Sequence, residues 1–109
     1  MKLVDLRDLL LTVTDDVFHY HATKKPDKYI VWAEDRQGNS GYADNRMTIQ
    51  GIQGTIDYFT NTEYDPTFDL IQEKLNSADI AWKLNSIQYE EETGYTHYEW
   101  AWELVNGIG

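Results

Sequence analysis

Large apolar and polar side chains alternate most strictly in YTHYEWAWELV, residues 95–105. One parity of this stretch holds the large side chains of Tyr98, Trp100, Trp102 and Leu104. The other parity holds a mainly polar set, His97, Glu99, Ala101 and Glu103. Because successive side chains of a β-strand point to opposite faces, the stretch is predicted to form a strand with one aromatic face. We interpret that face as core, with a subunit interface as the alternative, since Trp and Tyr are favoured interface anchors.

The preceding stretch, residues 80–89, is predicted to be the partner of this strand in a hairpin whose loop ends in Gly94. Its apolar residues fall into two groups of opposite parity, Ile80, Trp82 and Leu84 in one and Ile87 and Tyr89 in the other. A β-bulge near Asn85 and Ser86 would bring both groups to one face of the sheet.

The rest of the chain shows two helical patterns and three further strand patterns. A helix over residues 2–13 is predicted by the spacing of Leu3, Leu6, Leu10 and Val13. A second helix is predicted after Asp65, the expected N-cap, with Pro66 at its first position. Strands are predicted at residues 17–22, 29–34 and 47–60.

These elements follow the order α-β-β-β-α-β-β, and 109 residues fit a single domain, 1–109. Short connections favour antiparallel pairing. The predicted fold class is therefore α+β, a mainly antiparallel sheet with two helices packed on one face. Within the third predicted strand, Gly51 and Gly54 indicate a bulge or a close approach of two backbones.

Negative charge is concentrated in the second half of the chain. The net charge is −10, and residues 57–109 hold eleven acidic residues against two bases, Lys74 and Lys83. Such a surface repels phosphate backbones, so specific nucleic-acid binding is not expected. The simplest explanation of this acidic surface is that it promotes solubility. The more specific explanation is that the surface mimics DNA or must not adhere to DNA. The absence of cysteine excludes disulfides, thiolate catalysis and zinc–thiolate sites.

The reactive side chains have no recognised catalytic or metal-binding spacing. His19 and His21 share one face of a predicted strand, and a three-histidine metal site would need His97 beside them. The acids at 34–35 point to opposite faces of a strand, and those at 90–92 lie at a hairpin tip. A nucleophile elbow, a phosphate-binding glycine loop and a dinucleotide fingerprint are also missing. We therefore expect no enzymatic activity, no catalytic residue, and no metal or cofactor.

Basic residues gather in the first half of the chain, at the turn around Lys28 and on either side of the loop near Gly41. One hypothesis is a head-to-tail contact between the basic half of one subunit and the acidic half of the next, repeated until a ring closes. Scattered surface charge is the alternative. The candidate interface residues are Lys24, Lys25, Arg36, Arg46, Glu90, Glu91 and Glu92.

Three stretches resemble the tail-completion or tail-terminator proteins of long-tailed bacteriophages and prophages. They are YIVWAED (29–35) followed by YADN (42–45), GTIDYFT (54–60) leading to DPTFD (65–69), and AW (81–82) followed by YEEETGY (89–95) and the aromatic strand. None of the three is a catalytic signature, and the resemblance rests on their order and spacing.

The resemblance implies a virion structural protein that forms a ring, typically a hexamer, at the head-proximal end of the tail tube. Its partners would be copies of itself, the tail tube protein and the head–tail connector, with DNA passing through the ring without specific binding. The expected location is the virion tail, after assembly in the host cytoplasm, with no membrane association. The alternative function is an acidic DNA mimic, or another small inhibitor or adaptor, that binds a host protein.

Overall fold

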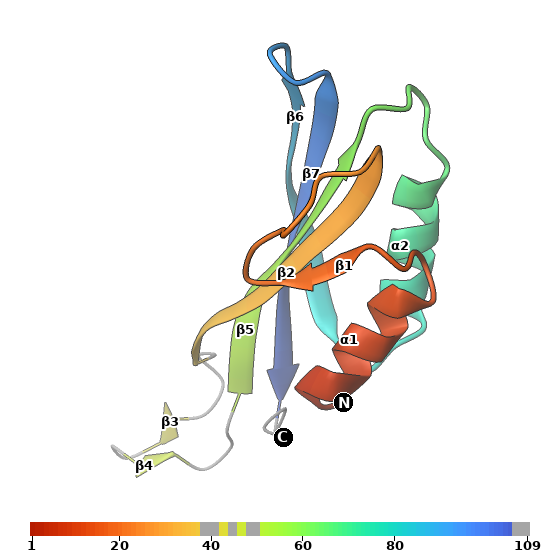
Figure 1. Cartoon of the computed structure of the whole chain (residues 1–109). Helices are drawn as coiled ribbons and strands as arrows, with labels where there is room; N and C mark the ends of the chain where they lie inside the picture. Colours follow the sequence, from red (N-terminus) through yellow and green to blue (C-terminus); the bar gives the residue numbers. More distant parts are fainter. Residues whose placement is uncertain (38–41, 44–45, 48–50, 106–109) are drawn as a thin grey trace.

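A computed structural model describes residues 1–37, 42–43, 46–47 and 51–105 (Figure 1). Its elements in chain order are α1 (Leu3–Leu11), β1 (Val17–His19), β2 (Lys28–Gln37), β3 (Tyr42–Ala43), β4 (Arg46–Met47), β5 (Gly51–Thr60), α2 (Thr67–Asn76), β6 (Ala81–Glu90) and β7 (Tyr95–Val105). Five strands form one sheet in the order β1-β2-β5-β7-β6, and β3 pairs with β4 separately. No helix in the described part of the chain is long and apolar enough to cross a membrane.

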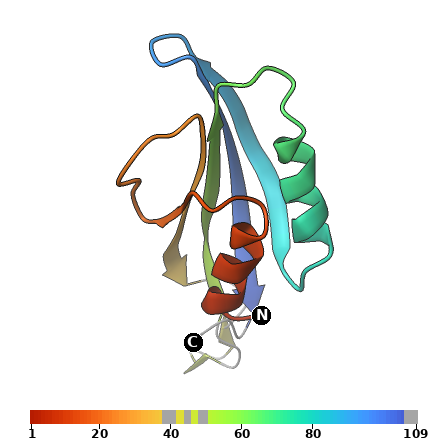
Figure 2. The same cartoon turned by 45° about the vertical axis from the view of Figure 1, so that its right-hand side comes forward.

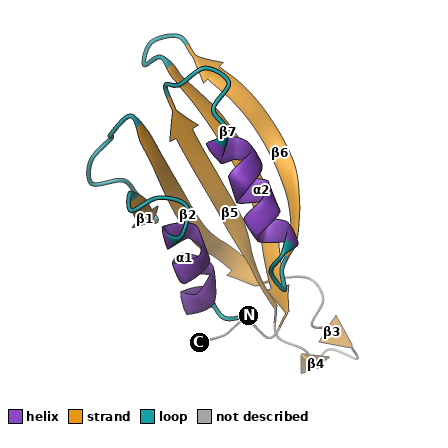
Figure 3. Cartoon of the chain, turned by 90° about the vertical axis from the view of Figure 1, so that its right-hand side faces the viewer, coloured by secondary structure: helices purple, strands orange, loops and turns teal. Residues whose placement is uncertain are grey.

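The predicted fold class is confirmed. Strands β2, β5, β7 and β6 pair in antiparallel fashion, and both helices lie on one face of the sheet (Figure 3). The predicted element order is also found, with the small β3–β4 pair added between β2 and β5.

The first strand differs from its prediction. It ends at His19 instead of residue 22, and it pairs with β2 in parallel. Tyr20 has a φ of 74°, and this left-handed backbone turns the chain out of the strand direction. The loop of residues 20–27 then returns the chain before β2 begins, so the short connection gives a parallel pair.

The core lies between the sheet and the helices. Trp100 and Trp102 of β7 are buried there together with Leu6 of α1 and Ile71 of α2. The prediction that the aromatic face of residues 95–105 is core is confirmed for these two tryptophans. The β-bulge is also confirmed, because the register between β6 and β7 shifts between Leu84 and Ser86.

Gly54 of β5 lies in close contact with both neighbouring strands, β2 and β7. Opposite it, the register between β2 and β5 shifts between Glu34 and Arg36. A Cβ atom at Gly54 would lie 1.9 Å from the backbone oxygen of Ala33 and 2.7 Å from the Trp102 ring. The predicted close backbone approach is therefore found at this glycine, whereas Gly51 pairs in register with Val105.

The start of α2 is fixed by Asp65. Its Oδ1 accepts a hydrogen bond of 2.9 Å from the Thr67 N–H, although the N-cap position is occupied by Pro66, one residue later than predicted. Pro66 has helical dihedral angles, φ −69° and ψ −12°, although the regular helix begins one residue later. The Tyr58 hydroxyl of β5 donates to Oδ2 of Asp65 at 2.5 Å, so the same carboxylate also attaches the helix to the sheet.

Candidate functional site

A hollow of about 570 Å³ opens on the sheet face that the helices leave uncovered, which we call the outer face. One side of the hollow is formed by the loop of residues 20–27, and its floor includes Val31 and Phe59. The loop is held in place by Tyr95 of β7. The Tyr95 hydroxyl lies 3.0 Å from the Lys25 carbonyl oxygen and 2.7 Å from that of Pro26.

A carboxylate–imidazole pair lies in this outer-face hollow. Nε2 of His97 on β7 is 2.7 Å from Oδ1 of Asp57 on β5, and both side chains are about four-fifths buried. The imidazole stacks on Phe59 with ring centroids 4.3 Å apart. The hydrogen bond with Asp57 raises the pKa of His97, although burial acts in the opposite direction. The geometry therefore favours a protonated imidazole that is held rigidly against an aromatic floor.

The hollow does not complete a catalytic triad. An Asp–His pair activates a nucleophile only when a hydroxyl or thiol lies within reach of the imidazole. The hydroxyls among its lining residues belong to Tyr20, Tyr29, Thr93 and Tyr95, and none is recorded in contact with His97. Thr93 instead bonds to Glu90, and Tyr95 bonds to the loop backbone. Among the described residues, the pair is a hydrogen-bonded contact that links β5 and β7 on the outer face.

Replacing Asp57 by asparagine is expected to make stability less dependent on pH. Because the folded-state pKa of His97 is raised above 6.5, the pair stabilises the fold fully below that pH and less as the pH rises through the raised value. We expect a loss of about 1 kcal/mol at pH 5.5 and a smaller loss at pH 9. Urea unfolding at the two pH values measures both losses. Glu73→Gln, an exposed acid on α2, is the control, and an equal loss at both pH values in Asp57→Asn would contradict the expectation.

A second feature is an exposed apolar patch on β6, which is an edge strand of the sheet. It consists of Leu84, Ile87 and Tyr89, whose exposed fractions are 36%, 54% and 65%. These three residues pair across the strands with Trp100, Tyr98 and Thr96 of β7. Their side chains therefore point to the face of the sheet on which the helices lie. The β6–β7 hairpin extends beyond the N-terminal end of α2 (Figures 1 and 2). The exposed fractions show that the β6 patch is left largely uncovered.

The structure places part of the predicted interface at one end of the molecule. Lys25 and Glu90 both line the outer-face hollow, so the basic turn and the acidic hairpin loop are neighbours within one chain. Lys24 forms an ion pair of 3.4 Å with Asp16. Glu91 and Glu92 are exposed at the hairpin tip. The side chains of Arg36 and Arg46 lie outside the described residues, and an intersubunit contact through any of these residues stays a prediction.

The three histidines are not brought together. Nε2 of His19 lies 2.5 Å from Oε1 of Glu34 and the ring stacks on Trp32, on the helix-covered side. His21 lies in the loop and lines the outer-face hollow with His97. Among the residues that the structure describes, no group of three or more potential ligands is placed to hold a metal ion.

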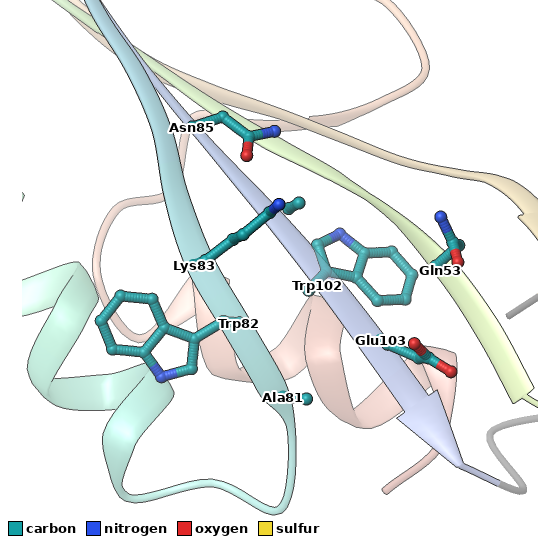
Figure 4. A pocket seen from close by; sticks show the side chains of 8 residues that line it. Gln53, Ala81, Trp82, Lys83, Asn85, Trp102 and Glu103 are labelled. Carbon is teal, nitrogen blue, oxygen red and sulfur yellow. The ribbon is translucent and has the colours of Figure 1, made fainter. Parts of the chain in front are cut away.

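A smaller hollow of about 340 Å³ lies over β5, β7 and β6 (Figure 4). Lys83 and Asn85 extend over it from β6, and Glu103 lies on the neighbouring strand β7. Trp102 also lines it, and its buried Nε1 has no acceptor within the described part of the chain. The lining holds no histidine and no serine, threonine or cysteine, and its charged side chains are Lys83 and Glu103.

Sequence reasoning missed the outer-face hollow because it depends on strand register. Asp57 and His97 are 40 residues apart and meet only through the pairing of β5 with β7. The β6 patch left a weak signal, since the bulge at Asn85 brings Ile87 and Tyr89 to the face that also carries the core. Comparison with known proteins gives no further guidance, because no family model and no curated protein sequence matches the chain.

Proposed function

We propose that this chain is a virion structural protein of a long-tailed phage or prophage. In this proposal it assembles with copies of itself into a ring at the head-proximal end of the tail tube, ends tail growth and joins the tail to the head. The resemblance of stretches between residues 29 and 105 to tail-terminator proteins supplies the specific role. The structure supports the general one, a protein that acts by docking.

The observation that carries the docking function is the β6 patch. Ile87 and Tyr89 are more than half exposed on an edge strand, although both belong to the apolar face of the sheet. Contiguous exposed apolar side chains at an edge strand mark a surface that another protein covers, since edges left open invite pairing. Tyrosine is among the side chains that supply much of the binding energy of protein interfaces.

The charge of the outer face is compatible with passage of DNA. Glu99 and Glu103 of β7 lie on this face with Lys83 of β6, while the carboxylate of Asp57 is paired with His97. If the outer face lined the channel of the ring, its carboxylates would repel phosphates and keep the DNA from adhering. The two functional surfaces would then be separate, with docking on the β6 patch and DNA passage along the outer face.

The proposal is tested by electron microscopy of phage particles made without this gene. We expect tails of irregular length and heads that are not joined to them. A phage carrying Ile87→Lys should show the same defect, because a charge at the centre of the β6 patch opposes burial. Asn76→Lys, at an exposed position at the end of α2 and outside both surfaces, is the control and should leave tails normal. Normal tails of fixed length joined to heads in the deletion phage would refute the proposed function.

The alternative function, an inhibitor that mimics DNA, predicts a different result. The tagged chain, expressed in the host, should then capture one host DNA-binding protein in stoichiometric amount. That contact would weaken as salt rises, because it would rest on the acidic residues of the second half of the chain. Capture of tail proteins alone would favour the virion role.

A further inference from the structure

We propose that two copies of the chain in solution pair edge to edge through β6 and continue one sheet across a two-fold axis. Residues 86–90 of one copy run antiparallel to residues 86–90 of the other, and Gln88 lies opposite Gln88 of the second copy. The β6 patch is then covered by the same patch of a second copy. This inference concerns the chain before any assembly and does not rest on the virion role.

The two edges of the sheet differ in how well they are protected from pairing. Strand β1 has three residues, and a very short edge strand offers another chain little to pair with. Strand β6 has ten residues, and its stretch 86–90 contains no proline and no lysine, which are common protecting residues at edges. Ile87, Gln88 and Tyr89 within this stretch are all exposed. The β6 edge is therefore the one that is open to another strand.

The ends of the regular part of β6 determine the register of the pair. The bulge between Leu84 and Ser86 interrupts the strand on one side, and the strand ends at Glu90 on the other. Two identical five-residue stretches pair along their whole length only when the central residue, Gln88, lies opposite itself. A shift by one residue would place the apolar face of one copy beside the polar face of the other. A shift by two would leave only three residues paired.

This register makes the β6 patch complementary to itself. Ile87 of each copy lies opposite Tyr89 of the other, on the face that carries the helices. An aromatic side chain opposite a β-branched one is a favourable cross-strand pair, and here it occurs twice. In the single chain the two side chains are 54% and 65% exposed, so the contact buries apolar surface that the fold leaves in water.

Charge favours the antiparallel arrangement. The two Glu90 residues are offset by four positions, about 13 Å along the strands, which exceeds the Debye length of about 8 Å at physiological ionic strength. The acidic loop of residues 90–92 extends toward Lys83 of the other copy, which lies just beyond the bulge. Lys83 is exposed and is one of two bases in residues 57–109. A parallel arrangement would instead bring the two acidic loops side by side, which costs free energy.

The dimer has a consequence for the β6 patch as a docking surface. A two-fold contact uses the same surface of both copies and closes at two, so it does not by itself build a ring. The two copies must therefore separate before the β6 patch docks onto another protein. Dimerisation through β6 thus regulates when that surface is available.

The oligomeric state in solution is the first test. Light scattering of the natural chain at high protein concentration should show a dimer. Ile87→Lys should raise the dimer dissociation constant more than about tenfold, because it places two charges in one apolar contact. Asn76→Lys, an exposed position at the end of α2, is the control and should leave the dissociation constant unchanged. A natural chain that remains a monomer under these conditions would overturn the inference.

Disulfide trapping tests the register, because the natural chain has no cysteine. Opposed residues of antiparallel strands have Cα atoms about 4.5–5.5 Å apart, within the range that a disulfide spans. Gln88→Cys should therefore give a covalent dimer on oxidation. Ala81→Cys, exposed on the same face of β6 and seven residues away, is the matched control and should remain a monomer on non-reducing gels. Equal cross-linking of the two variants, or none in Gln88→Cys, would overturn the edge pairing.

The tests of the dimer and of the virion role are independent. A monomeric natural chain would overturn the dimer, whatever the deletion phage shows. Joined, fixed-length tails in the deletion phage would refute the virion role, and a covalent Gln88→Cys dimer would still support the pairing through β6.

Discussion

Replacing Asp65 by alanine is expected to lower the free energy of unfolding by about 2–4 kcal/mol, because the substitution leaves the buried Tyr58 hydroxyl without its acceptor and removes the acceptor at the start of α2. The Asp65 side chain is fully buried and its Oδ1 lies 3.3 Å from Nζ of Lys28. It also accepts hydrogen bonds from the Tyr58 hydroxyl and the Thr67 N–H. Alanine leaves a buried hydroxyl without its acceptor, a helix end without its cap and a lysine without its counter-charge. Urea unfolding at pH 7 measures the loss.

The pKa of Asp65 gives the same network a pH signature. Burial alone would raise this pKa, but the hydrogen bonds from Tyr58 and from the Thr67 backbone lower it well below the ordinary value of 3.8. A lowered folded-state pKa means that the stabilisation is complete above about pH 4 and is lost as the pH falls toward the folded-state value. The natural chain should therefore lose stability in acid more steeply than Asp65→Asn, which keeps an acceptor but carries no charge.

Two variants isolate the parts of this network. Tyr58→Phe removes one hydrogen bond and keeps the ring, so it should cost about 1–2 kcal/mol. Asp69→Asn, an exposed acid in the first turn of the same helix, should change stability by less than about 0.5 kcal/mol. If Asp65→Ala lowered the free energy of unfolding as little as Asp69→Asn does, the hydrogen bonds of Asp65 would contribute little to stability. That result would contradict the conclusion that Asp65 attaches α2 to the sheet.

The fold was predictable where a local pattern determines a structure. The alternation around Trp100 and Trp102 predicted a buried strand face, and Asp65 before Pro66 predicted a helix start. Features that depend on the ends of elements were not predictable. The sequence does not reveal that the β6–β7 hairpin extends beyond the start of α2 (Figure 1), so Tyr89 was assigned to a face of the sheet without knowledge that it is exposed. The parallel pairing of β1 likewise depends on a left-handed Tyr20, for which L-residues have no intrinsic preference.

The candidate site was less predictable than the fold, for a related reason. The sequence places acids at many positions, but it does not show which carboxylate meets which base. Asp57 lies within a predicted strand and His97 within another, and their 2.7 Å contact follows from the register of β5 against β7. Lys25 and Glu90 were assigned to opposing halves by charge, whereas the fold places both at one hollow. Contacts between distant segments are decided by tertiary pairing and not by local composition.

Replacing Gly54 by alanine is expected to destabilise the fold by more than about 3 kcal/mol, the upper range for overpacking a core. The added Cβ would lie 1.9 Å from the Ala33 carbonyl oxygen, a distance that no side-chain rotation can relieve because the obstacle is backbone. Either β2 must separate from β5 at its bulge or the strands must lose their pairing. Thermal unfolding followed by far-UV circular dichroism should show a large fall in melting temperature.

Gly94→Ala is the matched control for this prediction. Gly94 has a left-handed backbone conformation but open space around it, whereas Gly54 lacks space for a side chain. Gly94 has a φ of 77°, and a Cβ there would meet nothing within 4 Å, so alanine should cost only about 1 kcal/mol of backbone strain. A second control separates the two obstacles at Gly54, since the Trp102 ring also lies 2.7 Å from the added atom. Adding Gly54→Ala to a Trp102→Leu background should still cost most of the loss seen in the natural chain. Full rescue in that background would show that the tryptophan ring, and not the bulged backbone of β2, requires the glycine.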